Sequence, residues 1–327
     1  MNKSVVTVIS VIGIIAILMA FGYWRNQVRL AKKEVVNTEK KIFCTTFPVY
    51  LFTKAVTKDV DRHVELLLPP NLGCPHDYSL TPGDLNKLRG NGDILVKNGL
   101  QLDDVICHAA LRANYSLQIV DSGHNITDLL PAGNNEDEYA DEHDEGCTCG
   151  GTHTHGSSNP HLFGSPFQAI RMVRNIGEQL QKLDPVNADA YRKNMDAYQA
   201  ELEKLCHEFT SESGKWTKRS FAAQHDVFSY LIRDLKLEEG VLVRASAESA
   251  PSTVEVIELI RAIKEKKINV IFTEPQYPPA LSEMIAKEAG IKADTLDPVA
   301  SGPQDATPEY YLEIMRKNLE TLTRYLK

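Results

Sequence analysis

Short strand-like segments alternate with helical segments in two blocks of the chain, and this alternation most constrains the fold. In the first block, the strand-like segments are residues 41–47, 63–68, 93–97 and 116–121. The second block has strand-like residues 220–224, 240–243, 268–273 and 291–296, and a helical segment closes it at 308–327. Strands that alternate with helices at this spacing predict parallel sheets with helices on both faces.

A long helical stretch, residues 165–215, separates the two blocks. Apolar residues recur at helical spacing on both sides of the pair Asp184-Pro185, which interrupts the pattern. The stretch is consistent with one rigid connecting helix or with a helical hairpin. We predict an α/β protein of two Rossmann-like lobes, residues 41–164 and 216–327, joined by a long rigid connecting helix. The cleft between two such lobes is a common place for a ligand.

The N-terminal 24 residues differ in character from the rest of the chain. Lys3 is followed by an apolar run of 20 residues that ends at Trp24. This length matches the ~20 residues of a spanning helix better than the ~7–15 of a signal-peptide core. Run length therefore favours an uncleaved signal anchor in residues 1–24 over a cleaved signal peptide, for which Ala20-Phe21-Gly22 would be the cleavage site. Residues 25–40 are polar and are expected to form a spacer.

The charges beside this run leave its orientation open. One basic residue precedes the run, and four follow it: Arg25, Arg29, Lys32 and Lys33. By the positive-inside rule, this bias would leave the globular body in the cytoplasm, against the extracytoplasmic location that its function implies below. The whole chain has a net charge of -8 without a visible basic patch, so nucleic acid is not an expected partner.

Residues 134–158 break the alternation and are expected to form a mobile insertion. The insertion has seven acidic residues between Glu136 and Glu145, and then four metal-ligand types among glycines: Cys147, Cys149, His153 and His155. The six cysteines of the chain form no recognisable disulfide framework. Three of them lie in apolar or helical patterns and are predicted to be small buried residues: Cys44, Cys107 and Cys206.

Three histidines, His76, His161 and His225, lie in segments between predicted elements, and two acids, Glu274 and Asp297, follow predicted strands. Ligands of open α/β sheets bind beyond the carboxyl ends of strands, so these side chains are candidates for one site. Three neutral imidazoles and a carboxylate suit a borderline cation such as Zn²⁺. Each residue also has an ordinary interpretation: a hydrogen-bonding loop histidine, a turn-forming aspartate before proline, or a salt-bridging glutamate.

Several ordered motifs carry a family resemblance. They are His-Asp-Tyr-x-x-Thr-Pro-x-Asp-Leu at 76–85, Asn-Pro-His-Leu-Phe-Gly-Ser-Pro at 159–166, Gln-His-Asp-Val-Phe-Ser-Tyr-Leu at 224–231, Phe-Thr-Glu-Pro-Gln-Tyr at 272–277 and Leu-Asp-Pro at 296–298. In this order they resemble the solute-binding proteins of zinc and manganese ABC importers, from about residue 41 to residue 327 apart from the insertion. Several ordered motifs are more specific than any single one.

The resemblance implies a buried metal between the lobes. It gives His76, His161 and His225 as the nitrogen ligands and Asp297 as the carboxylate ligand, although some zinc-specific members use water or another acid there. Glu274 is then an alternative ligand or a support for one. The chain departs from the usual Asp-Pro-His-x-Trp at Asn159 and Phe163.

The resemblance further implies binding and transport rather than catalysis. The expected role is capture of Zn²⁺ outside the cytoplasm by a monomer, in the periplasm or at the outer face of the membrane. The expected partner is an ABC permease with its cytoplasmic ATPase. Three imidazoles favour zinc over Mn²⁺ or Fe²⁺, and Cys147, Cys149, His153 and His155 are candidates for an accessory metal loop. The alternatives are the same role for Mn²⁺ or Fe²⁺, an extracytoplasmic zinc hydrolase, and a surface adhesin with a structural metal.

Overall fold

The computed structural model describes residues 41–72, 78, 80–89, 92–132, 158–243 and 251–327. Residues 40–327 form one compact unit of the chain. The predicted signal anchor or signal peptide, the spacer and the insertion lie outside the described residues. Within the described residues, no helix is both long enough and apolar enough to span a membrane.

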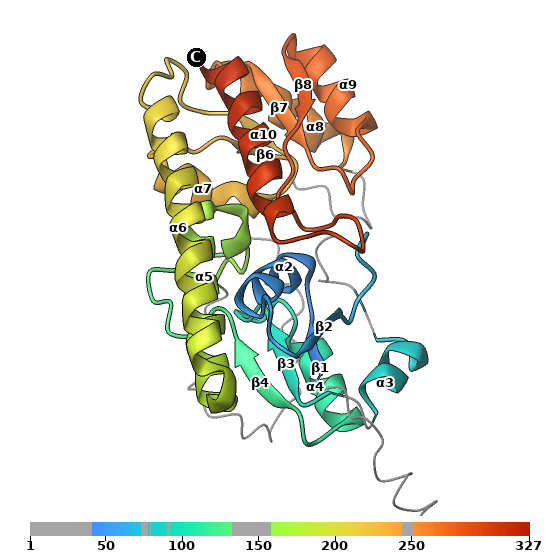
Figure 1. Cartoon of the computed structure of the whole chain (residues 1–327). Helices are drawn as coiled ribbons and strands as arrows, with labels where there is room; N and C mark the ends of the chain where they lie inside the picture. Colours follow the sequence, from blue (N-terminus) through green and yellow to red (C-terminus); the bar gives the residue numbers. More distant parts are fainter. Residues whose placement is uncertain (1–40, 73–77, 79, 90–91, 133–157, 244–250) are drawn as a thin grey trace, which may run out of the picture. The chain divides into compact units, whose positions relative to one another are not determined.

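The first sheet has four parallel strands in the order β2-β1-β3-β4 (Figure 1). They are β1 (Lys41–Cys44), β2 (His63–Leu66), β3 (Ile94–Lys97) and β4 (Gln118–Asp121). The helices of this lobe are α2 (Phe47–Val56), α3 (Pro82–Leu88) and α4 (Asp104–Ala113). The central strands β1 and β3 are apolar on both faces, as a parallel sheet covered on both sides requires.

The second sheet repeats this topology with the order β6-β5-β7-β8, again all parallel. Its strands are β5 (Ala222–Ala223), β6 (Val241–Leu242), β7 (Val270–Thr273) and β8 (Lys292–Thr295). Its helices are α7 (Ser229–Asp234), α8 (Thr253–Glu265), α9 (Ala280–Ala289) and α10 (Glu309–Leu326). In each sheet the chain reverses its direction of winding between the first and third strands, β1 and β3 or β5 and β7. Ligands of open α/β sheets bind beside such a reversal.

Two helices connect the lobes: α5 (Pro166–Leu183) and the 26-residue α6 (Ala188–Ser213). They pack along one another and are separated by the short 3-10 turn η3 (Pro185–Asn187), so the stretch is a helical hairpin. Helix α6 also packs against α2 of the first lobe and α10 of the second, as Figure 1 shows. Helix α6 is therefore the predicted long connecting helix. The stretch is thus both a helical hairpin and a rigid connection between the lobes.

Buried side chains alternate between two cores along each central strand. Ile42, Cys44, Val270 and Phe272 belong to one large core that continues through both lobes and the connecting helices. Phe43 faces a smaller core of the first lobe, and Ile271 faces a smaller core of the second lobe. The prediction that Cys44, Cys107 and Cys206 are small buried residues is confirmed, and all three are free thiols.

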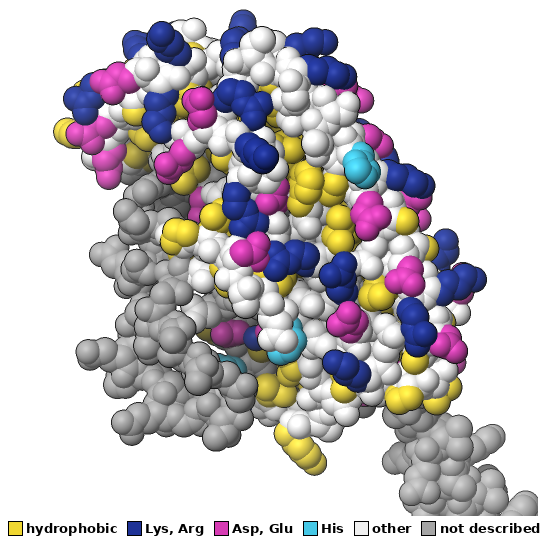
Figure 2. Space-filling model, turned by 90° about the vertical axis from the view of Figure 1, so that its left-hand side faces the viewer, with side chains coloured by type: hydrophobic (Ala, Val, Ile, Leu, Met, Phe, Trp, Pro, Cys, Tyr) yellow, Lys and Arg dark blue, Asp and Glu magenta, His cyan; other side chains and the backbone are white. Residues whose placement is uncertain are grey.

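The surface that faces the viewer in Figure 2 mixes Lys and Arg side chains with Asp and Glu side chains. Among the described residues on this face, neither sign of charge gathers into a separate patch. Mixed charge of this kind is typical of a solvated surface.

Candidate metal centre

His161 lies in a buried turn between the two lobes. The chain enters this turn through Asn159, whose backbone N–H donates to the carbonyl of Leu130 at 2.8 Å. The side-chain oxygen of Asn159 then accepts the backbone N–H of His161 at 2.9 Å, an Asx turn that asparagine favours. The 3-10 turn η2 (Leu162–Gly164) follows directly. The His161 side chain is fully buried, which is unusual for histidine unless its ring nitrogens have partners.

His225 and Asp226 follow strand β5, at the reversal point of the second sheet. His225 is still extended, and the chain then turns into the 3-10 turn η4 (Asp226–Phe228). The backbone N–H of Gln224 donates to the carbonyl of Phe272 on β7 and so fixes the direction of the chain before His225. The His225 side chain is 21% exposed, so this ring is the more accessible of the two imidazoles.

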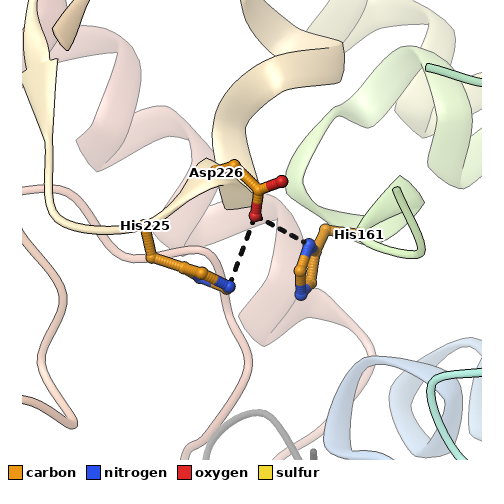
Figure 3. A group of neighbouring side chains, drawn as sticks. All are labelled: His161, His225 and Asp226. Atoms are coloured by element: carbon orange, nitrogen blue, oxygen red, sulfur yellow. Dashed lines mark ion pairs between the residues drawn. The ribbon is translucent and has the colours of Figure 1, made fainter. Parts of the chain in front are cut away.

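The three side chains His161, His225 and Asp226 converge (Figure 3). The two ring centroids are 4.5 Å apart with an interplanar angle of 78°. Oδ1 of Asp226 lies 3.4 Å from Nδ1 of His161 and 3.4 Å from Nε2 of His225. One ligand atom from each residue lies within 4.8 Å of the others. Two imidazoles and a carboxylate at this separation form a donor set that suits Zn²⁺.

Glu274 follows strand β7 and supports His225 from the side opposite Asp226. Its Oε1 lies 3.5 Å from Nδ1 of His225, and its side chain is only 2% exposed. The amide of Gln276 donates to Oε2 of the same carboxylate at 2.7 Å. A carboxylate beside the second ring nitrogen is the usual way in which proteins orient a metal-binding imidazole.

Asp297 follows β8 and lies outside the group of three. Its Oδ1 accepts the backbone N–H of Val299 at 2.7 Å, and its backbone is held by Asn318. Burial raises the pKa of Asp297 to about 6, and the negative charge of Glu274 adds to this effect. Its assignment as the carboxylate ligand stays a prediction.

The predicted ligand His76 lies outside the described residues, as do Cys147, Cys149, His153 and His155. The motif that contains His76 continues among the described residues into α3. There Thr81 and Asp84 form a capping box, and the hydroxyl of Tyr78 donates to Oδ2 of Asp84 at 2.8 Å.

Two residues of this centre were missed by sequence reasoning: Asp226 and Asn159. Asp226 follows His225 directly in the sequence, and this adjacency was the available signal. Asn159 was noted only as a departure from a motif. Its contact with Asp226 joins residues 67 positions apart and has no signal in the sequence.

The fold and the centre together define a class: two-lobed α/β binding proteins with a helical connector and a pair of neighbouring imidazoles, one of which follows a strand end. Within this class, the chain belongs to the family described as ZnuA, zinc-uptake complex component A, periplasmic, whose model matches residues 42–325. The family resemblance of the sequence motifs is thereby confirmed.

Curated relatives agree with this assignment. The zinc-binding lipoprotein AdcA of Streptococcus pneumoniae is 29% identical over 299 residues, which cover 90% of this chain and 57% of the relative. The high-affinity zinc uptake system protein ZnuA of Bacillus subtilis is 30% identical over 284 residues, which cover 86% of each protein. The chain thus spans 57–61% of the length of the AdcA relatives.

Solved structures are similar over most of this chain. A crystal structure of ZnuA has a TM-score of 0.73 and 26% identity, and the match covers 88% of this chain and 99% of that one. The laminin-binding protein Lmb of Streptococcus agalactiae, described as a bifunctional protein with adhesin and metal transporting activity, has a TM-score of 0.72 and 26% identity; the match covers 88% and 100%. The predicted two-lobed fold is thus confirmed.

Proposed function

We propose that this chain is the metal-capturing, solute-binding subunit of an ABC importer for Zn²⁺. The observation that carries the proposal is the close contact between His161 and His225, with Asp226 beside both rings. One imidazole is fully buried and the other is 21% exposed, so neither ring is an ordinary solvated histidine, and their chemistry suits a borderline divalent cation. The proposed role is binding and release rather than catalysis.

The proposed ligand set combines the described centre with the family resemblance. His161 and His225 supply two nitrogen ligands, and His76 is the proposed third. Asp297 is the proposed carboxylate ligand, and Asp226 is the carboxylate that lies beside both imidazoles. Because nitrogen ligands outnumber oxygen ligands in this set, zinc is favoured over Mn²⁺ or Fe²⁺.

The proposed location is extracytoplasmic, which the family description as periplasmic and the lipoprotein relatives support. The N-terminal apolar run would serve as anchor or signal peptide. The monomer would dock, loaded with metal, on a membrane permease that a cytoplasmic ATPase drives. The segment with Cys147, Cys149, His153 and His155 is proposed as an accessory metal loop.

The test is a thermal melt of the metal-free, full-length chain in a mild detergent, with Zn²⁺ or Mn²⁺ added. A ligand that binds only the folded state stabilises it by about 4 kcal/mol at a thousandfold excess over Kd. We expect this shift with Zn²⁺, its loss in His161→Ala and His225→Ala, and its retention in His207→Ala, which changes an exposed histidine of α6.

The outcomes separate the alternatives. A shift with Mn²⁺ alone would move the assignment to the same role for Mn²⁺; the structurally similar Pseudomonas aeruginosa protein FpvC is described in complex with Mn²⁺. No shift with either metal would refute the metal-capture proposal.

A further inference from the structure

The side-chain amide of Asn159 lies between a candidate metal-binding ring and the carboxylate beside it. Its Oδ1 is 2.9 Å from the backbone nitrogen of His161 and 3.0 Å from Nδ1 of the same residue. Its Nδ2 is 2.9 Å from Oδ2 of Asp226 and 3.2 Å from the Asp226 carbonyl oxygen. Asn159 is 1% exposed, so these contacts are shielded from water.

The partners of this amide determine its orientation. The backbone N–H of His161 can only donate, so it must face the amide oxygen of Asn159. The carboxylate and carbonyl oxygens of Asp226 can only accept, so they must face the amide NH₂. The reversed amide would place donor against donor at His161 and acceptor against acceptor at Asp226. The orientation therefore follows from groups whose roles are fixed.

This orientation in turn determines the tautomer of His161. Nδ1 of the ring faces Oδ1 of Asn159 at 3.0 Å and Oδ1 of Asp226 at 3.4 Å, and both of these atoms are acceptors. Nδ1 must therefore carry the proton of the neutral imidazole. The lone pair that would bind a metal is then on Nε2.

Asn159 is itself held in place by the protein around it. The hydroxyl of Tyr230, on α7, donates to the Asn159 carbonyl at 2.8 Å. From the first lobe, the side-chain amide of Asn98 donates to the carbonyl of Pro160 at 3.0 Å. The backbone of Asn159 and Pro160, from which the amide projects, is thus held by contacts from both lobes.

We infer that Asn159 is a positioning residue that fixes the Nδ1–H tautomer of His161 and holds the Asp226 carboxylate beside it. The expected effect of Asn159 on metal binding rests on the proposed function, whereas the inferred tautomer of His161 does not. An aspartate at 159 would also accept Nδ1–H, but it would place a second carboxylate about 3 Å from that of Asp226, where like charges repel. The neutral amide of Asn159 therefore suits the neighbouring Asp226 carboxylate, because it adds no second negative charge.

The first test is the tautomer of His161 in the metal-free, full-length chain, observed by NMR with nitrogen-labelled histidine. The spectrum is recorded at about pH 8, above the ordinary imidazole pKa of about 6.5. His161→Gln assigns the signal. We expect the proton on Nδ1 in the wild type and its redistribution to Nε2 in Asn159→Leu. Asn175→Leu, which removes an amide of α5 that donates to two carbonyls away from the centre, should leave the tautomer unchanged.

The second test is a pair exchange. Asn159→Asp should lower the denaturant midpoint of the metal-free chain, and adding Asp226→Asn should restore more than half of the loss, because the new amide can donate to the new carboxylate. Zinc affinity should fall by about 10–100-fold in Asn159→Leu, as is typical when the partner of a metal-binding histidine is removed.

The outcomes separate this inference from the proposed function. A proton on Nε2 in the metal-free wild type would overturn the inference even if zinc binds tightly. An unchanged tautomer in Asn159→Leu, or no recovery in the paired variant, would also overturn it. Failure of the wild type to bind zinc would instead refute the proposed function and leave the tautomer result standing.

Discussion

At the residue scale, the two imidazoles are placed by direct contact between their backbone segments. Gly164, just after His161, packs against the carbonyl of Val227, just after His225, so closely that a Cβ at position 164 would overlap this oxygen. The side chain of Asn159 adds hydrogen bonds to Asp226 across the same junction. The separation of the two rings therefore depends on a glycine and an asparagine as well as on the histidines.

Gly164→Ala should destabilise the protein by about 1–3 kcal/mol, because the added methyl meets a backbone atom that cannot rotate away. Denaturant unfolding measures the loss. Gly83→Ala, in α3, is the matched control: its Cβ would lie 3.5 Å from the nearest atom, the hydroxyl oxygen of Thr81, and replacing a helical glycine should stabilise the protein by about 0.5–1 kcal/mol. Equal effects of the two substitutions would contradict the close contact.

The candidate ligands could be predicted from the sequence one by one, but their geometry could not. His161 and His225 belong to local motifs at element ends, where residue type and position point to a ligand site. The roles of Asn159 and Asp226 arise only when loops far apart in the chain meet. Local patterns contain no measure of that distance.

At the element scale, the junction between α5 and α6 is joined to the first sheet by a buried ion pair. Arg62, just before β2, lies 2.9 Å from Asp184 and also pairs with Asp93. Asp184 also accepts hydrogen bonds from Asn187 and from the hydroxyl of Tyr191. Burial opposes the charged form of Asp184, but these three donors outweigh burial and hold its pKa below the usual value.

Asp184→Asn should lower the free energy of unfolding at neutral pH by about 1.5–3 kcal/mol, the range for a hydrogen bond to a charged group. Because the folded-state pKa is depressed, this stability is present above the unfolded value of about 3.9 and is lost as pH falls through the folded value. The difference in the free energy of unfolding between the wild type and Asp184→Asn should therefore become smaller below about pH 4.

Unfolding at several pH values measures this difference, and Asp189→Asn is the control. Asp189 is 98% exposed in α6 and should change stability by less than about 0.5 kcal/mol at any pH. A gap between Asp184→Asn and wild type that stays constant down to acid would contradict the pKa assigned to Asp184.

Local sequence signals mark the ends of helices more directly than they mark the lengths of strands. The capping boxes at Thr81 and Ser252 and the left-handed Gly290 after α9 are local signals, and the structure has them. Strands β5 and β6 are only two residues long, shorter than the predicted 220–224 and 240–243. Strand length depends on how far neighbouring strands run side by side, which periodicity does not record.

At the scale of the whole molecule, the lobes share one core. The hydroxyl of Tyr311, on α10, donates to the carbonyl of Phe163 at 2.7 Å, and that of Tyr198, on α6, donates to the carbonyl of Pro308 at 2.8 Å. The large core includes apolar residues of both sheets and of both connecting helices. Two lobes that are buried against one another in this way should unfold together.

Hydrogen exchange under native conditions should give the central strands β1 and β7 the same free energy of opening. Helix α8 provides an internal comparison, because Ile263 is its one buried residue. The amides of α8 should therefore exchange through local openings with a lower free energy than that of the central strands. A clearly lower value for one central strand would mean that its lobe opens independently.

The number of lobes, the α/β class and the helical connector could be predicted from the alternation of strand-like and helical segments. Each of these features is a consequence of local periodicity. The common strand order of the two sheets and the core that joins them did not follow. No sequence repeat links the lobes, and the shared core depends on which face each helix turns toward the other lobe.

The central claim, that His161 and His225 bind one metal ion together, can be tested by zinc-edge X-ray absorption of the loaded, full-length chain. We expect nitrogen ligands at about 2.0–2.1 Å with the outer-shell pattern of imidazole, and one imidazole fewer in His161→Ala and in His225→Ala. Zinc bound without imidazole scattering, or with a spectrum that neither substitution changes, would contradict the account.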